Sequence, residues 1–186
     1  MTNRHSTPQA RAEVYAKVLF DSSNSAGSVD AVVNSRNEFL EIINTLSNNV
    51  DARSILASKD VEFETKKKLI SIICEGKSEA ASAVFSSAVE LGDSGLLKVV
   101  LRKLEDLISE DLKVCIVDVT SAVELDDHLR ELIKDKAKRE LGLDAILYEK
   151  VDPEILGGVI MSVNGKCIDA SMITQLNRAR SVLKAS

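Results

Sequence analysis

Two glycines near the C-terminal end of the chain invite comparison with a phosphate-binding loop. Such a loop follows the pattern GxxxxGK[ST], because consecutive backbone N–H groups must curl around a phosphate. Here six residues separate Gly158 from Gly165, and Lys166 is followed by Cys167 instead of Ser or Thr. The GxGxxG pattern of dinucleotide-binding proteins does not occur either. The sequence therefore predicts no nucleotide-binding loop.

The same region contains the residues best suited to catalysis, a thiol and three carboxylates. Cys167 could act as a nucleophile, but no histidine lies near it in the sequence, and a buried structural thiol is the simpler interpretation. Asp152, Glu154 and Asp169 could pair as general acid and base, although turn and cap roles explain them better. The three scattered cysteines and two histidines show no metal-ligand spacing. We therefore predict no catalytic, cofactor-binding or metal-binding residues, and no enzymatic activity of the chain's own.

Composition narrows the function classes further. The chain has 186 residues, 45% hydrophobic but only 3% aromatic, so we expect an aliphatic core in one large or two small domains. Its net charge of −5 argues against general nucleic-acid binding, which needs a basic surface. No apolar run approaches the roughly 20 residues that span a bilayer, and the N-terminus lacks the apolar segment of a signal peptide. We expect a soluble protein with reduced cysteines.

The expected secondary structure changes from helices alone to a mixture of strands and helices near residue 112. Up to that point apolar residues recur at helical spacing, with an expected loop at Asp21–Gly27, N-caps at Ser28 and Asp51, and a solvated basic run at Lys66–Lys68. We predict six helices with short loops, which form an all-α bundle over residues 1–112. Their apolar stripes run over residues 10–19, 29–46, 55–56, 63–73, 81–91 and 97–112.

Residues 113–186 predict a small α+β domain. A Val- and Ile-rich strand from Lys113 precedes a helix over 124–141 with Gly142 as its C-cap, and a second strand spans 144–151. Asn164-Gly165 between two short apolar runs is a strong hairpin signal, because both residues tolerate the positive φ of a type I′ turn. The predicted order is β-α-β-β-β-α, so the whole chain is α+β and mainly α.

A signature of turn and cap residues surrounds this hairpin. Asp152-Pro153 marks a chain reversal, Gly157-Gly158 opens a strand, and Ser171 can cap a last amphipathic helix. We predict that these residues shape a scaffold and carry out no reaction. The structural signature comprises Asp152, Pro153, Leu156, Gly157, Gly158, Asn164, Gly165, Asp169 and Ser171.

Three stretches of the sequence resemble one family. The stretch VDPEILGGVIMSVNGKCIDASMITQL, the opening helix at Tyr15–Phe20, and Val119–Ala122 followed by Leu125 are similar to motifs of the delta subunit of bacterial F-type ATP synthases. In mitochondria this subunit is called the oligomycin-sensitivity-conferring protein. Element order and length agree over almost the whole chain. The departures are mild, but Gly95-Leu96 stands where the family often has Gly-Arg, which leaves no arginine to carry a role there.

The resemblance implies a non-catalytic stator component that resists rotor torque while proton flow drives ATP synthesis. Residues 1–112 would bind N-terminal segments of alpha subunits in a groove between the first and fifth helices, and residues 113–186 would meet the b subunits of the peripheral stalk. The protein would lie at the cytoplasmic face of the bacterial inner membrane, peripheral through its complex. The expected groove residues are Tyr15, Val18, Leu19, Val84, Phe85 and Ala88, the last three by helix position alone.

Two other function classes stay open from the residues alone. One is a small acidic adaptor that binds nucleic acid or another protein complex, against which the acidic composition and the lack of an aromatic stacking surface count. The other is an enzyme that uses Cys167.

Overall fold

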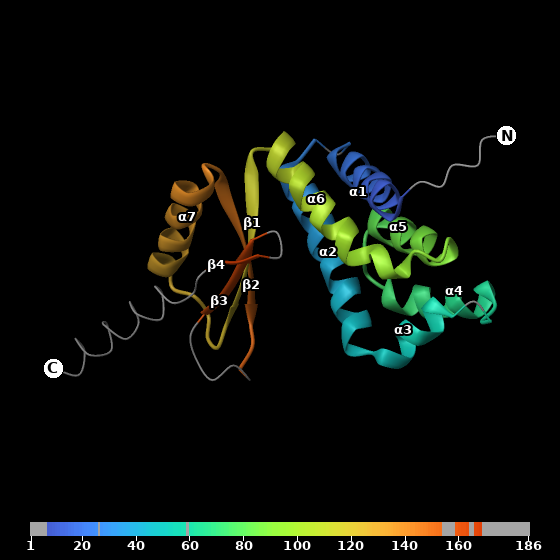
Figure 1. The fold of residues 1–186 in the computed structure, drawn as a ribbon. Helices are drawn as coiled ribbons and strands as arrows, with labels where there is room; N and C mark the ends of the chain where they lie inside the picture. The colour runs from blue at the N-terminus through green and yellow to red at the C-terminus, as the bar shows by residue number, and fades with distance from the viewer. Residues whose placement is uncertain (1–6, 26, 59, 154–158, 164–165, 169–186) are drawn as a thin grey trace. The chain divides into compact units, whose positions relative to one another are not determined.

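A computed structural model describes residues 7–25, 27–58, 60–153, 159–163 and 166–168. The chain divides into two compact units, Met1–Ile108 and Ser109–Ser186 (Figure 1). The described residues form a mainly helical protein with a small mixed sheet, which confirms the predicted class at that level.

Helices account for nearly all of the described part of the first unit. They are α1 (Pro8–Asn24), α2 (Val29–Asn48), α3 (Val50–Ala57), α4 (Phe63–Ile73), α5 (Glu79–Glu90), the 3-10 turn η1 (Ser94–Leu96) and α6 (Leu97–Asp111).

The centre of the first unit is where α1, α2 and α5 contact one another. The side chains of Leu19, Phe39 and Phe85 have no exposed surface there. The aliphatic core expected from the composition is therefore supplemented by phenylalanine at its most buried positions.

The end of α1 differs from the prediction. The Ser- and Asn-rich run that begins at Asp21 continues the helix to Asn24 instead of forming a loop. The hydroxyls of Ser23 and Ser25 donate to the carbonyls of Leu19 and Asp21, at 2.8 and 2.7 Å. These bonds satisfy carbonyls at the helix end, where hydroxyls compete well with water.

Two further local predictions were wrong for similar reasons. The N-cap of α3 is Asn49, whose Oδ1 accepts from the Ala52 N–H at 3.0 Å, and Asp51 lies in the first turn instead. Lys66 is buried, and its Nζ donates to the Ser58 carbonyl at 2.6 Å. The solvated basic face therefore comprises only Lys67 and Lys68.

A buried ion pair joins α2 to α6. Arg36 and Glu105 are 1% and 4% exposed, and the Arg36 Nε donates to Glu105 Oε1 at 2.9 Å, with Nη2 bonded to the same oxygen. The sequence pattern placed Arg36 within an apolar stripe, so its charge must be matched inside the protein.

The second unit contains a four-stranded sheet in the order β2-β1-β3-β4. Its described elements are β1 (Val114–Ser121), α7 (Asp127–Leu141), β2 (Asp144–Val151), β3 (Val159–Val163) and β4 (Lys166–Ile168). The β1 strand pairs in parallel with β2 and antiparallel with β3. Two parallel strands need a crossover connection. Here α7 lies in the connection between β1 and β2 and packs against β2.

One face of the sheet and α7 enclose the core of this unit. Every second residue of β1 contributes, starting with Cys115, because side chains alternate between faces along a strand. From α7 come Ile133 and Ala137. The helix starts at Asp127 and not at residue 124, because the Asp126 side chain caps it by accepting from the Leu129 N–H. Gly142 ends it with a φ of 70°, which confirms the predicted left-handed cap.

The hairpin is confirmed through its strands. Antiparallel pairing of Val163 with Lys166, continuing to Met161 with Ile168, leaves a two-residue connection between β3 and β4. Asn164 and Gly165 lie outside the described residues. So do Leu156, Gly157, Gly158, Asp169, Ser171 and the last predicted helix.

Candidate partner interface

A partly apolar stripe runs along the solvent face of α1. Arg11, Val14 and Val18 are spaced three and four residues apart, so their side chains lie on one side of the helix. Val14 is 62% exposed and Val18 is 49% exposed. Large aliphatic side chains in a row on one helix face are the anchors that helix-in-groove contacts use.

The six predicted groove residues fall into two groups. Tyr15, Leu19, Val84, Phe85 and Ala88 are all buried, and only Val18 faces solvent. The structure does bring the first and fifth helices together, since α1 and α5 contact each other (Figure 1). The buried five therefore support the position of α1, while the side chains available for direct contact are Val18 and its neighbour Val14.

A long-range polar contact holds α1 in place. The Tyr15 hydroxyl donates to Asp93 Oδ2 at 3.2 Å, and Arg11 Nη2 lies 2.9 Å from Asp93 Oδ1. Asp93 is only 5% exposed and sits in the turn between α5 and η1. Burial, followed by the charge and hydrogen bond of Asp93, raises the pKa of Tyr15 to about 12, so the phenol is neutral at physiological pH.

Sequence reasoning missed this contact. Asp93 is the N-cap residue of η1, but its side chain makes no cap bond there. One usable signal was Tyr15 itself, since a tyrosine in an otherwise aliphatic stripe needs a partner for its hydroxyl when buried. The identity of that partner depends on tertiary structure.

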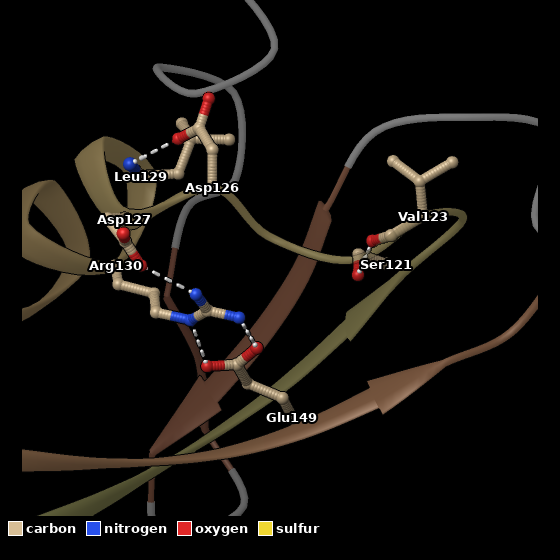
Figure 2. A network of polar contacts seen from close by, with 7 residues as sticks. All are labelled: Ser121, Val123, Asp126, Asp127, Leu129, Arg130 and Glu149. Carbon is tan, nitrogen blue, oxygen red and sulfur yellow. Dashed lines mark hydrogen bonds and ion pairs between the residues drawn. The ribbon is translucent and has the colours of Figure 1, made fainter.

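In the second unit, a polar network lies at the start of α7 (Figure 2). Arg130 donates through Nε and Nη2 to the two carboxylate oxygens of Glu149 on β2, at 2.8 and 3.0 Å, and through Nη1 to Asp127 at 2.8 Å. The bidentate pair fixes a direction as well as a distance. It ties the first turns of α7 to the edge strand β2.

The loop between β1 and α7 is held by two further bonds. Ser121 Oγ donates to the Val123 carbonyl at 2.6 Å (Figure 2), and the Asp152 N–H donates to the Ser121 carbonyl at 2.8 Å. Ser121 belongs to the stretch Val119–Ala122, which resembles a family motif, and Asp152 opens the predicted signature. The structure therefore brings two separate motifs together, next to Val123, which is 72% exposed.

Two free cysteines, Cys74 and Cys115, lie among the residues that the structure describes. Burial raises the pKa of the Cys74 and Cys115 thiols, which lowers their thiolate fraction and hence their reactivity. Within the described ranges, no cluster of three or more His, Cys, Asp and Glu side chains could hold a metal ion. The side chain of Cys167 and the carboxylates Glu154 and Asp169 lie outside what the structure describes.

Comparison with known proteins identifies the family. The family model for the ATP synthase delta (OSCP) subunit matches residues 12–183. The chain belongs to this family. A protein called ATP synthase subunit delta from Prochlorococcus marinus (strain MIT 9301) is 31% identical over 168 residues, covering 88% of this chain and 91% of that protein. Another of that name, from Limosilactobacillus reuteri (strain DSM 20016), is 26% identical over 173 residues, covering 92% and 94%.

A solved structure supports the fold of this delta-family chain. A chain in the cryo-EM structure of the Toxoplasma gondii mitochondrial ATP synthase hexamer superposes with a TM-score of 0.54 at 16% identity, covering 94% of this chain and 98% of that one. None of the helices in the described parts of the chain is long and apolar enough to cross a membrane.

Proposed function

We propose that this chain is a non-catalytic stator subunit of a proton-translocating F-type ATP synthase. It would link the alpha/beta catalytic head to the b-subunit stalk and resist the torque of the rotor. Family membership supports the complex, and the exposed stripe on α1 is the observation that carries the linking role. Val14 is 62% exposed on a helix that Tyr15 and Arg11 tie to Asp93, in the turn after α5. An exposed aliphatic side chain on a helix held in this way suits a surface that a partner covers.

Residues 1–112 would bind the head through the N-terminal segments of alpha subunits. An amphipathic partner helix would lay its apolar residues against Val14 and Val18, with α5 as the second wall of the groove. On α5 the solvent-facing positions include Ala83 and Ser87, whose small side chains allow a close approach. Arg11, 44% exposed, would favour an acidic residue at the edge of the partner helix.

Residues 113–186 would face the b subunits at the cytoplasmic side of the bacterial inner membrane, so that the protein is peripheral to the membrane. The exposed Val123 and Val151, together with the signature at residues 152–171, are the proposed contact region. Arg130 and Glu149 would keep α7 and β2 from shifting under load.

A stator must stay bound while force acts on it. A nanomolar attachment corresponds to about −12 kcal/mol. Apolar burial contributes about 25 cal/mol per Å², and association itself costs several kcal/mol. With two separate partners, one for each unit, each contact would supply only part of the binding free energy.

The groove assignment is tested with full-length protein and a synthetic peptide from the alpha-subunit N-terminus of the same organism. Calorimetry should give an affinity that Val18→Asp weakens by about tenfold or more, because a buried valine contributes about 1.5–3 kcal/mol. Val50→Asp is the matched control, since Val50 is 63% exposed at the start of α3. Equal affinity of the two variants would contradict the groove.

The stalk contact is tested separately. Tagged full-length protein should co-purify alpha and b subunits from detergent-solubilised membranes. Recovery of alpha without b would contradict the second attachment while leaving the first intact.

A further inference from the structure

A concave site in the first unit lies between α2, α3 and the η1–α6 turn. The pocket has a volume of about 140 Å³, and its lining includes no residue of α1 or α5. Four aliphatic side chains, Ile43, Leu46, Leu56 and Leu97, line it, and each is at most 6% exposed. At the floor of this pocket, solvent therefore reaches part of the apolar core.

Two cations stand at this apolar pocket. Arg53 from α3 and Lys98 from α6 both line it, and both are exposed. In the described part of the chain neither has a carboxylate within ion-pair distance, whereas Arg130, Lys67 and Lys138 each have one. On a chain of net charge −5, two cations beside apolar side chains match a ligand that has both an apolar part and a negative group.

The aliphatic side chains and the two cations together indicate the chemical class of the ligand. We propose that this pocket binds a short monocarboxylate, with its apolar tail against Leu56 and Ile43 and its carboxylate between Arg53 and Lys98. An aliphatic cavity of about 150 Å³ can hold one benzene molecule, so the tail has about five to seven carbons. Inorganic phosphate would leave the apolar walls unused, and a neutral alcohol would leave the two cations unused. This site is independent of the proposed stator role.

The test uses full-length protein with hexanoate as the probe and 1-hexanol as its neutral counterpart. Amide chemical shifts should change for residues around the pocket, with a Kd for hexanoate on the order of 1 mM. Hexanol should bind about tenfold more weakly, and salt at about 0.5 M should weaken hexanoate binding alone, because salt screens exposed charges. Both comparisons use the unmodified chain.

Variants then assign the charges. Arg53→Gln with Lys98→Gln should weaken hexanoate about tenfold, since charge-assisted hydrogen bonds are lost. Lys68→Gln with Arg102→Gln removes the same charge from two exposed positions outside the pocket and should change nothing. The proposal is overturned if hexanol binds as well as hexanoate, if both double variants behave alike, or if the shifts map to α1.

Discussion

The buried pair of Arg36 and Glu105 gives the sharpest test of how the first unit is held together. The two residues lie 69 positions apart in sequence, and Arg36 donates twice to one carboxylate oxygen. Arg36 also donates to the Asn37 side chain at 3.3 Å. With exposures of 1% and 4%, neither charge can recover hydration if its partner is removed.

Truncating one partner should therefore cost far more than losing a surface ion pair. Surface pairs contribute about 0–1 kcal/mol, whereas leaving a buried charge uncompensated costs about 3–5 kcal/mol. We expect Arg36→Met to lower the free energy of unfolding by that larger amount, because Met fills much of the volume but cannot pair with Glu105. The double variant Arg36→Met with Glu105→Leu should recover most of the loss, since no buried charge is left.

Urea unfolding of the wild type, both single variants and the double variant gives the coupling between the two sites. Lys67→Met, which removes the exposed pair with Glu64, is the matched control and should change stability by less than about 1 kcal/mol. A cost of Arg36→Met no larger than that of this control would refute the buried-charge explanation. A double variant whose loss of stability equals the sum of the losses in the two single variants would also refute it.

Two further predictions concern Tyr15 and Gly142. The pKa of Tyr15 in the folded protein is raised to about 12 from an ordinary value of 10.0, so the free energy of unfolding should fall as the pH rises from 10 to 12, by at most about 3 kcal/mol. Tyr15→Phe should lack this loss, because phenylalanine does not titrate. Parallel curves of unfolding free energy against pH for the two proteins would refute this prediction. Gly142→Ala should cost about 1 kcal/mol through its positive φ alone, because an added Cβ meets no heavy atom within 4 Å. Gly95→Ala, with equal space and no positive φ, should be close to neutral, and a similar loss in both variants by urea unfolding would contradict the explanation.

Apolar periodicity was sufficient to predict most of the elements. A stripe such as Phe39 to Leu46 buries one helix face, and this local regularity is visible in one dimension. The prediction failed where side chains bond to the backbone. Ser23 extends α1 through a bond four residues back, and Asn49 caps α3 in place of Asp51, so composition alone placed these ends two to four residues wrong.

For the proposed interface, the sequence indicates a helix but not which face of that helix is exposed. Tyr15, Val18 and Leu19 were grouped because they share a motif, but one turn of a helix has both a core side and a solvent side. Leu19 is fully buried and Val18 is 49% exposed, although the two are adjacent in sequence. Which face of α1 is free depends on where α5 packs, and that packing joins segments far apart in the chain.

Two buried polar contacts of the first unit fix the position of one helix along another part of the unit. Apolar stripes can slide along each other at small cost, because the dispersion attraction given up at one place is regained at the next. A hydrogen bond between Tyr15 and Asp93, or a pair of bonds between Arg36 and Glu105, has one geometry and is broken by a shift of a fraction of a helical turn. The first fixes α1 against the turn that follows α5, and the second fixes α2 against α6. The exposed stripe at Val14 and Val18 is thus presented on a helix whose position is set by a directional bond, which is a property that the proposed stator contact would need.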